Sequence, residues 1–423
     1  MPRYINELPE EILGMVFFEF VGQEEPQQMR QHSPPQRLLG VCRLWKEVAE
    51  AHSEIWSRID VDFGKHFSAA VGNKIQRAKR SPLGLYIHCS HSRTYSPAAL
   101  TRDVLAFYDQ IKDHRWRALS IFDPRWLEPF QIIFQHMIGN PQTCRITSFQ
   151  LGGTDFVSYD NGVAHTLVKK ALGQHLRVTH LVMEAALLKP SHPLLQVVPY
   201  LQLHRAYDLT QVLDCVGEAS SLRSLRVDHL WGGPQRYDST LTRTLPKLEH
   251  LELRECHAIP KLLILRLDLP NIQSLTFKVV NCKVKDGDEQ LKSLFWTVSW
   301  LRQLRSLTLE EVEISEEALF FVLRRLPLLT SLTLTSQARV SCRTTKTLSL
   351  PPEGRRGWMS PLLEVITFGE CPRLSESDVV ALVEARVCDI PHTAPASAST
   401  EDQPPPSRLR KVIWKGRDMV QRG

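Results

Sequence analysis

A short apolar pattern recurs along most of this 423-residue chain: one apolar residue, two variable residues, a second apolar residue, one variable residue and a third apolar residue. In its most regular stretch the central residues Leu181, Leu201, Leu225, Leu251 and Leu275 are 20, 24, 26 and 24 positions apart. Self-similarity of this kind is typical of a solenoid, in which each unit buries its apolar face only against its neighbours. We therefore predict an α/β solenoid with one parallel strand per repeat.

Further copies of the pattern extend the predicted array in both directions. The clear copies are Ile146-Phe149-Leu151, Val178-Leu181-Met183, Val198-Leu201-Leu203, Leu222-Leu225-Val227, Leu248-Leu251-Leu253, Ile272-Leu275-Phe277, Leu304-Leu307-Leu309, Leu329-Leu332-Leu334 and Leu363-Ile366-Phe368. Trp116-Leu119-Ile121 and Leu409-Val412-Trp414 fit as the first and last members. Between strands, Ser315–Leu326 and Ser375–Ala385 have helical spacing and are expected to pack on the outer side of the sheet.

The array resembles leucine-rich repeats. It matches that family in the spacing of the apolar core, and it departs from it in the turn after each strand, where the family expects Asn or Cys. Cys256 and Cys371 stand at that position, whereas Gln337 and the other equivalent residues do not match. The resemblance implies a degenerate, irregular array. An ordinary α/β sheet whose strands share the pattern by chance stays open as the alternative.

Two apolar segments, Asn6–Phe18 and Leu38–Val61, precede the array. In the first, Pro9 fits the first helical position, and Glu10 and Glu11 complement the helix dipole. Apolar residues follow at helical spacing and predict one stripe: Ile12, Leu13, Val16, Phe17 and Phe20. The second segment predicts a shared face for Leu38, Val41, Cys42, Trp45, Val48 and Ala49. Three short helices bury little core alone, so they either cap the larger domain or present apolar faces to a partner.

These segments carry a second resemblance. Leu8-Pro9, Glu11-Ile12-Leu13, Val41-Cys42-Arg43-Leu44-Trp45 and Glu54-Ile55-Trp56 resemble an F-box, in the variant common in large fungal families. The long polar spacer Gly22–Pro35 departs from the family pattern. The resemblance implies docking on the Skp adaptor, and through it on a cullin, in a Skp–cullin–F-box ubiquitin ligase. The implied contact residues are Leu8, Pro9, Ile12, Leu13, Val16, Leu39, Val41, Trp45 and Trp56, with Trp45 and Trp56 expected to divide between docking and internal packing.

The predicted domain order has five parts. They are an F-box-like three-helix domain at 1–62, a helix–strand–helix connector at 63–111, the solenoid at 112–387, a disordered Pro/Ala/Ser/Thr-rich linker at 388–407, and a terminal strand and tail at 408–423. In the connector, helices are expected at Phe67–Lys79 and Pro97–Ile111, with a strand between them. Residues 336–357 interrupt the array, and Leu348 and Leu350 suit an extra hairpin strand. Leu409–Trp414 is expected to cap the array, with a loose amphipathic tail as the alternative.

Composition narrows the function classes. The net charge of +6 is modest, and the basic residues are mostly interleaved with acids, which argues against nucleic-acid binding. The nine cysteines include no CxxC pair, which indicates a reducing compartment. No apolar run suits a signal peptide or a membrane span. We expect a soluble intracellular protein, cytoplasmic or nuclear or both, with no membrane partner.

Signals of catalysis and of metal binding are weak. No phosphate-binding loop, nucleophile elbow, HExxH or GxGxxG motif occurs. The histidines around Cys89 and Cys256 have no metal-site spacing, and the acidic run Asp286–Glu289 lacks the ligand series of a calcium loop. The sequence therefore predicts a protein that is not an enzyme and needs no cofactor or metal.

One row of residues would face outward from the strands, between the last two apolar positions of each copy. A solenoid of this type binds its partners there, and simple solvation of each residue is the alternative. The substrate-face candidates are Gln150, Gln202, Arg226, Glu252, Thr276, Thr308, Thr333 and Thr367, with Val182 in the same row. The favoured function is a substrate adaptor of a Skp–cullin–F-box ligase that binds an unknown protein substrate. The alternative is a repeat scaffold without a ligase role, whose N-terminal helices cap the solenoid.

Overall fold

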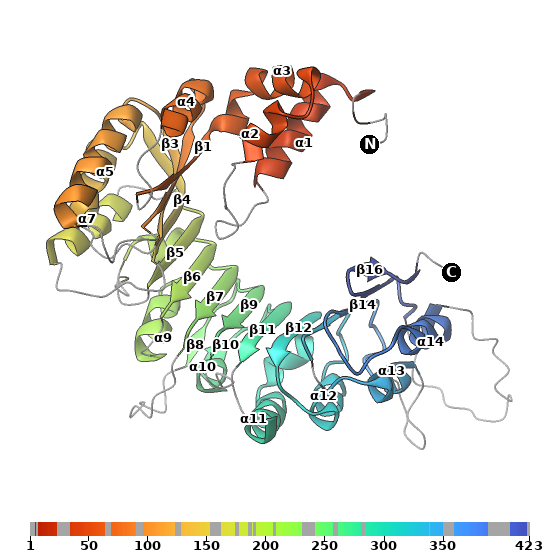
Figure 1. Ribbon diagram of the computed structural model, residues 1–423. Helices are drawn as coiled ribbons and strands as arrows, with labels where there is room; N and C mark the ends of the chain where they lie inside the picture. Colours follow the sequence, from red (N-terminus) through yellow and green to blue (C-terminus); the bar gives the residue numbers. More distant parts are fainter. Residues whose placement is uncertain are drawn as a thin grey trace, which may run out of the picture. The chain divides into compact units, whose positions relative to one another are not determined.

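The structure, a computed structural model, describes most of the chain. The described residues are 5, 7–22, 34–63, 69–89, 96–122, 128–152, 162–173, 177–184, 188, 192–205, 209–230, 242–256, 261–280, 284–337, 339–349, 359–387 and 407–420. They form two compact units: an N-terminal unit of residues 1–183 and 192–194, and a C-terminal unit of residues 184–191 and 195–423. Both are α/β, with a sheet that is mostly parallel (Figure 1).

The N-terminal unit places short helices before a parallel sheet with strand order β1-β2-β3-β4-β5. Its elements are α1 (Glu10–Gly22), α2 (Pro34–Leu39), α3 (Arg43–Ala51), η3 (Ser53–Trp56), β1 (Arg58–Asp62), α4 (Ala69–Ala78), β2 (Leu83–His88), α5 (Pro97–Ile111), β3 (Trp116–Phe122), η4 (Glu128–Phe130), α6 (Gln131–Gly139), β4 (Cys144–Gly152), α7 (Gly162–Gly173) and β5 (His180–Glu184). The predicted connector elements are confirmed as α4, β2 and α5.

The sheet begins before the predicted solenoid boundary at residue 112. Strand β2 pairs in parallel with β1 on one side and with β3 on the other, so the connector belongs to the array. The reason is visible in the side chains, because Leu83, Leu85 and Ile87 are fully buried, like the apolar residues of later strands. The prediction therefore placed the start of the array too late in the sequence, although it correctly identified β2 as a strand.

The first helix begins one residue later than predicted. The carbonyl of Pro9 accepts the first helical hydrogen bond from the Leu13 amide at 2.9 Å, so Pro9 precedes the helix instead of opening it. The helical conformation is interrupted between α2 and α3 at Cys42. Its backbone is extended (φ −160°, ψ 173°), and its side chain is exposed. The predicted shared face is therefore wrong at Val41 and Cys42, which lie in this break and face solvent.

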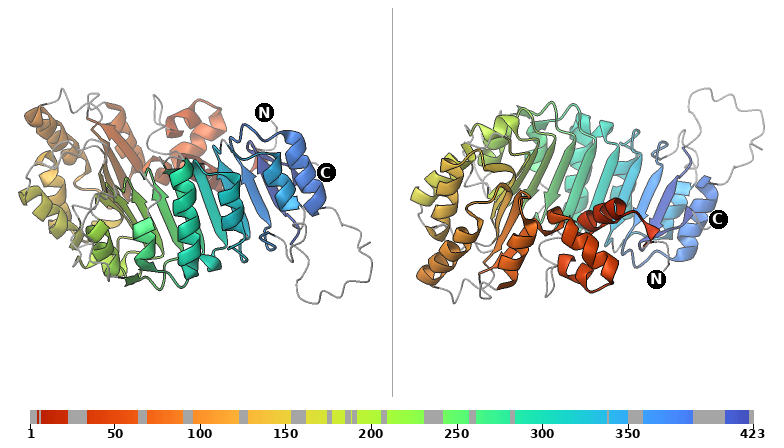
Figure 2. Two further views of the ribbon diagram at one scale, coloured as in Figure 1. Left: turned by 90° about the horizontal axis from the view of Figure 1, so that it is seen from below. Right: turned by 90° about the horizontal axis from the view of Figure 1, so that it is seen from above.

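The C-terminal unit repeats strand and helix in regular alternation. Its elements are α8 (Leu194–Val197), β6 (Tyr200–His204), α9 (Leu209–Gly217), β7 (Ser224–Asp228), β8 (Arg243–Thr244), β9 (His250–Arg254), α10 (Lys261–Leu265), β10 (Leu267–Asp268), β11 (Ser274–Val280), α11 (Val284–Thr297), η6 (Ser299–Gln303), β12 (Ser306–Val312), α12 (Glu316–Leu323), β13 (Ser331–Thr335), α13 (Cys342–Ser349), β14 (Val365–Phe368), α14 (Glu376–Val387), β15 (Lys411–Trp414) and β16 (Arg417–Asp418). Helices α9 to α13 cover one face of the sheet β6-β7-β9-β11-β12-β13-β14-β15-β16 and leave the other open (Figures 1 and 2).

A residue in the left-handed region recurs at or near the end of the strand in six consecutive repeats. The residue two places after the last apolar position has a positive φ each time, and none of these residues is glycine. They are Arg205, His229, Glu255, Val279, Glu311 and Ser336, with φ between 47° and 54°. This recurrence supports a repeat architecture, because an ordinary sheet has no reason to place the same costly conformation at the same position of six successive strands.

We expect Val279→Gly to stabilise the protein by about 0.5–1 kcal/mol. Val279 is β-branched and adopts φ 53°, a region in which its Cβ is strained and in which glycine is not. The free energy gained when that strain is relieved exceeds the free-energy cost of the greater backbone freedom that glycine has in the unfolded chain. Chemical denaturation measures the change. Val280→Gly is the matched control and should destabilise, because Val280 is buried; equal destabilisation by both variants would contradict the argument.

In the C-terminal unit, a carboxylate in the first turns of one helix accepts hydrogen bonds from the serine that precedes the next helix. Asp288 of α11 accepts hydrogen bonds from the amide (2.8 Å) and hydroxyl (2.5 Å) of Ser315, which caps α12. Glu316 repeats the arrangement one unit later, where it accepts from the amide and hydroxyl of Ser341. The acidic run that only distantly resembled a calcium loop thus lies in α11 and holds the next helix in place.

The turn after the strand uses more residue types than the family pattern predicts. The buried Cys371 thiol lies 3.6 Å from the Leu334 carbonyl of the neighbouring repeat. Gln337, which departs from that pattern, is buried, and its side-chain amide donates to the Leu309 carbonyl at 3.2 Å. Gln337 therefore ties its turn to the end of the neighbouring strand, although its residue type does not match the family pattern.

In the described part of residues 336–357, Cys342–Ser349 forms helix α13, so Leu348 does not lie in the expected hairpin strand. Leu348 is buried within α13, and Leu350 lies outside the described residues, as does the predicted linker apart from Ser407. The expected final strand is confirmed as β15, which pairs in parallel with β14. A two-residue strand, β16, then pairs antiparallel with β15.

We expect Arg386→Met to destabilise the C-terminal unit by about 3 kcal/mol. The buried Arg386 guanidinium donates to the carbonyls of Leu348 (2.9 Å), Leu363 (3.3 Å) and Ser407 (3.0 Å). Methionine fills similar space but leaves these carbonyls without that donor. The exposed Arg373→Met is the control. Indistinguishable urea midpoints for the two variants would contradict this role for Arg386.

Candidate functional site

Helix α1 has apolar side chains on two faces, not on the single stripe that the sequence predicted. One face is internal, with Leu13, Phe17 and Val21 at most 5% exposed. The other remains open and is here called the α1 apolar surface. It consists of Ile12 (40% exposed), Met15 (60%), Val16 (41%) and Phe20 (43%).

The remaining predicted adaptor contacts fall into two groups. Pro9 and Val41 are exposed, and Leu8, Leu39 and Trp45 are half-buried. Leu13 and Trp56, in contrast, have no exposed surface. We therefore correct the prediction for these two residues: they hold the helices together and present nothing to a partner.

Trp45 and Trp56 differ in burial, and a docking role for the less buried Trp45 stays a prediction. Trp56 is internal: its indole N–H donates to the Ala49 carbonyl at 2.6 Å, and the Arg77 guanidinium of α4 stacks 4.5 Å above its ring. Trp45 contacts the Phe17 ring, with 4.8 Å between the ring centroids, and keeps part of its surface in solvent. Trp56 thus fixes α3 against the start of the sheet, while Trp45 supports the inner face of α1.

Exposed apolar residues at this spacing can bind another helix. Residues 12, 15, 16 and 20 recur at i, i+3, i+4 and i+8, which is the spacing of anchors that enter a hydrophobic groove. Isolated exposed apolar residues are ordinary, but several on one helix face indicate an interaction surface. The α1 apolar surface is therefore the first candidate functional site.

The second candidate site is a row along the open face of the C-terminal sheet, here called the strand-face row. Strand register aligns its members in one line. They are Gln202, Arg226, Glu252, Thr276, Thr308, Thr333 and Thr367. All are half-exposed except Gln202, which is buried. Gln150 and Val182 pair with each other in the N-terminal unit, in β4 and β5.

The sequence reasoning missed the charged residues two places further along these strands. The side chain of Arg226 pairs with Asp228 at 2.8 Å, and Arg254 pairs with Glu252. Lys278 pairs with Glu310 across two strands at 2.7 Å. Alternation would have revealed them, because residues two apart on a strand share a face. The pairs on β7 and β9 make the β6–β9 end of the open face ionic. The pair Lys278–Glu310 adds charge on β11 and β12, where the strand-face row itself carries threonine.

Asp228 is the centre of the ionic end. Its carboxylate accepts from Gln202 (2.7 Å) and Arg226 (2.8 Å) and lies 2.9 Å from His204 Nδ1. Burial alone would raise the pKa of Asp228. The hydrogen bonds from His204 and Arg226 and the charge of Arg226 outweigh burial and lower the pKa to about 2. This end of the sheet is thus a rigid network of paired charges.

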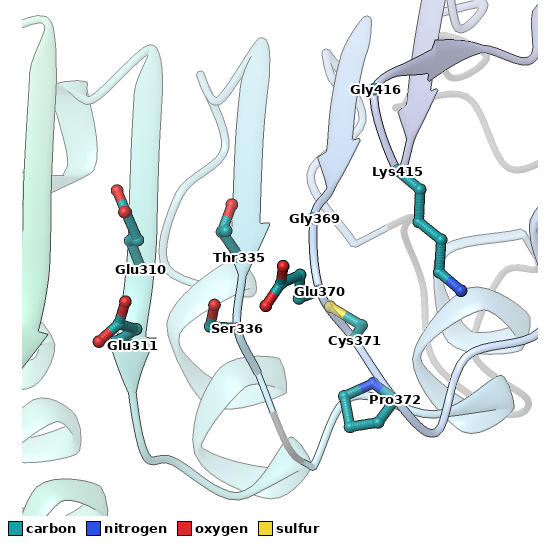
Figure 3. A pocket seen from close by; sticks show the side chains of 10 residues that line it. All are labelled: Glu310, Glu311, Thr335, Ser336, Gly369, Glu370, Cys371, Pro372, Lys415 and Gly416. Atoms are coloured by element: carbon teal, nitrogen blue, oxygen red, sulfur yellow. The ribbon is translucent and has the colours of Figure 1, made fainter. Parts of the chain in front are cut away.

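A cavity of about 1020 Å³ opens where strands β12 to β15 end. Figure 3 shows Glu310 and Glu311 at the end of one strand, Ser336 beyond the next, and Glu370 after the third. Gly369 is required here, since a Cβ at this position would lie 2.6 Å from Thr335 Cγ2. The three carboxylates of the lining outnumber its one ammonium group, that of Lys415, so this edge of the open face is acidic.

Carboxyl groups with displaced pKa values are candidates for acid–base catalysis when they lie in a cavity. Two such groups are Glu184 and Asp228. Burial raises the pKa of Glu184 to about 7 in spite of the nearby Arg205, and Asp228 has the low value given above. Neither is among the described side chains that line the cavity at β12–β15. Within the described residues no group of three His, Cys, Asp or Glu side chains is placed to hold a metal ion. Among the described helices, none has the length and apolar character needed to cross a bilayer.

Comparisons with known proteins add little to this geometry. No protein-family model matches the chain, and no curated protein matches it. Among solved structures, the chain is similar to one from the "Crystal structure of Rad7 and Elc1 complex in yeast", with 15% sequence identity and a TM-score of 0.40. The similarity covers 87% of this chain and 90% of that one. A likeness of this size carries no argument about function, so the case for function depends on the two surfaces.

Proposed function

We propose that this protein is the substrate-recognition adaptor of a Skp–cullin–F-box E3 ubiquitin ligase. The observation that carries the proposal is the α1 apolar surface, in which Ile12, Met15, Val16 and Phe20 stay exposed while Leu13 and Phe17 form an internal face. The F-box-like residues lie in α1 and the two residues before it, in α3 and the break before it, and in η3. A Skp-type adaptor would cover the exposed face and leave the internal one undisturbed.

The strand-face row would then select the protein substrate. An array of half-exposed polar side chains on a rigid sheet can recognise a partner without rearrangement, since the register fixes each side chain relative to the next. The protein itself would perform no chemistry. It would hold the substrate near a ubiquitin-loaded enzyme and so raise the effective concentration of the reacting groups.

Reconstitution with a recombinant Skp-type adaptor tests this proposal. The full chain and the adaptor are mixed at micromolar concentration and separated by size-exclusion chromatography. We expect a one-to-one complex, and its mass can be measured by light scattering. A folded chain that elutes alone at these concentrations would contradict the proposal.

A repeat scaffold without a ligase role is the second candidate. The buried Ile55 and Trp56, together with the Arg77 stack on Trp56, favour it in part, because they hold the last N-terminal helix against the array as a cap would. This function needs no partner for α1. The same reconstitution separates the two, since a scaffold would remain folded and uncomplexed.

A further inference from the structure

A second, smaller cavity lies at the opposite edge of the C-terminal sheet, where the strands begin. Its volume is about 430 Å³, and it is built from equivalent positions of neighbouring repeats. Arg223, Glu249, Gln273 and Arg305 each stand just before their strand, and Lys247 stands in the turn that enters β9. The cavity is separate from the α1 apolar surface and from the strand-face row.

The charge of this cavity is strongly one-sided. Three cationic side chains, Arg223, Lys247 and Arg305, line it together with one carboxylate, Glu249. Among the described residues no carboxylate lies within 4.0 Å of any of these three cations, whereas Glu249 lies 4.0 Å from His250. The cations elsewhere on the open face, such as Arg226 and Lys278, are paired. The cavity therefore concentrates cations that have no ion-pair partner within 4.0 Å among the described residues.

The spacing of the cations fits an extended peptide. Arg223 and Arg305 precede strands β7 and β12, which are separated by three strand spacings, about 14 Å at the usual distance between paired strands. An extended peptide covers this distance in about four residues. The carboxamides of Gln273 and Gln303, which also line the cavity, can donate to and accept from a peptide backbone. The apolar Leu328 at the same wall suits a protein segment better than a nucleic-acid backbone.

We propose that this cavity binds an acidic, extended segment of a partner protein, with carboxylates of that segment paired to Arg223, Lys247 and Arg305. The proposal does not depend on the ligase role. It concerns the strand-start edge of the sheet and would hold equally for a scaffold. The partner segment at this edge would be acidic. The carboxylate-lined cavity at the strand ends would instead favour a basic partner.

Binding of a fluorescein-labelled hexaglutamate peptide to the full chain tests the proposal, measured by fluorescence anisotropy at about 50 mM salt, where ion pairs are weakly screened. The triple variant Arg223→Gln/Lys247→Gln/Arg305→Gln is expected to weaken binding at least tenfold. The control Arg324→Gln/Arg339→Gln/Lys411→Gln removes the same charge from exposed positions outside the cavity and should change binding less than twofold. Equal weakening by both variants would mean non-specific attraction and would overturn the proposal.

Two further measurements keep the proposal falsifiable. Zero-length carbodiimide cross-linking of hexaglutamate to the wild-type chain should place the major cross-link on Lys247, as read by mass spectrometry. A major cross-link on lysines outside the cavity would refute the assignment even if the triple variant failed to fold. A dodecamer of uridylate is the competitor: if it binds more tightly than the peptide and depends on the same three side chains, the occupant is a nucleic acid and the proposal is wrong.

Discussion

Ile12→Asp/Val16→Asp is expected to weaken binding of a Skp-type adaptor at least about 100-fold and to leave the fold intact. Both side chains are about two-fifths exposed, so the free protein accommodates the carboxylates in water. In a complex the same positions would be covered, and the carboxylates would lose their hydration without a partner charge. That cost, added to the lost apolar contact, amounts to about 3 kcal/mol or more, which corresponds to a factor of about 100.

The matched control for this experiment is Leu105→Asp/Ala106→Asp. Leu105 is 44% exposed and Ala106 is also exposed, on helix α5 of the same unit. The control carries the same added charge, and its helix-propensity penalty is larger, because Leu and Ala favour a helix more than Ile and Val do. Isothermal titration calorimetry gives the affinities, and circular dichroism verifies that both variants are folded. Adaptor binding that is equally strong for both double variants would exclude the α1 apolar surface as the docking site.

Asp228→Asn is expected to reduce the free energy of unfolding by about 2–3 kcal/mol at pH 7, with a loss that shrinks as the pH falls. The pKa of Asp228 in the folded protein is about 2, below the ordinary value near 4. The stabilisation from its ionised form is therefore fully present above about pH 4. It disappears as the pH falls through the folded value. Asparagine cannot ionise, so the variant lacks this component at every pH.

Urea denaturation at several pH values between 7 and 2 measures the difference between wild type and Asp228→Asn. We expect the two stabilities to converge between about pH 4 and pH 2. The exposed Asp113→Asn should differ from wild type by no more than about 0.5 kcal/mol throughout. A difference for Asp228→Asn that stayed constant down to pH 2 would show that shape, and not charge, accounts for its role.

Much of the fold was predictable from apolar spacing alone. Leu307 and Leu309 occupy the strand positions that their pattern predicted, and Ser315 caps a helix in the expected region. Such features are local, so neighbouring residues determine them. The start of the sheet was missed because β1 and β2 lack the complete repeat pattern, although their alternating apolar residues are just as buried.

The candidate sites were harder to predict, for two physical reasons. On α1 both faces are apolar, and only packing against α3 and η3 determines that Leu13 is internal and Ile12 external. On the sheet, the pairing of Lys278 with Glu310 joins residues 32 positions apart in the sequence, and it depends on strand register. The cations of the small cavity come from separate repeats for the same reason. Spacing in sequence does not show which repeats are neighbours.

The small strand β16 has a consequence for self-association. A parallel array that stopped at β15 would leave a full row of amide and carbonyl groups free to pair with a strand from another molecule, which is a common route to aggregation. Instead the chain turns at Lys415 and Gly416 and folds back, so that Asp418 and Arg417 pair with Ile413 and Trp414. Two residues are too few to template a further strand. This end of the sheet is therefore protected against edge-to-edge growth by the turn at Lys415 and Gly416.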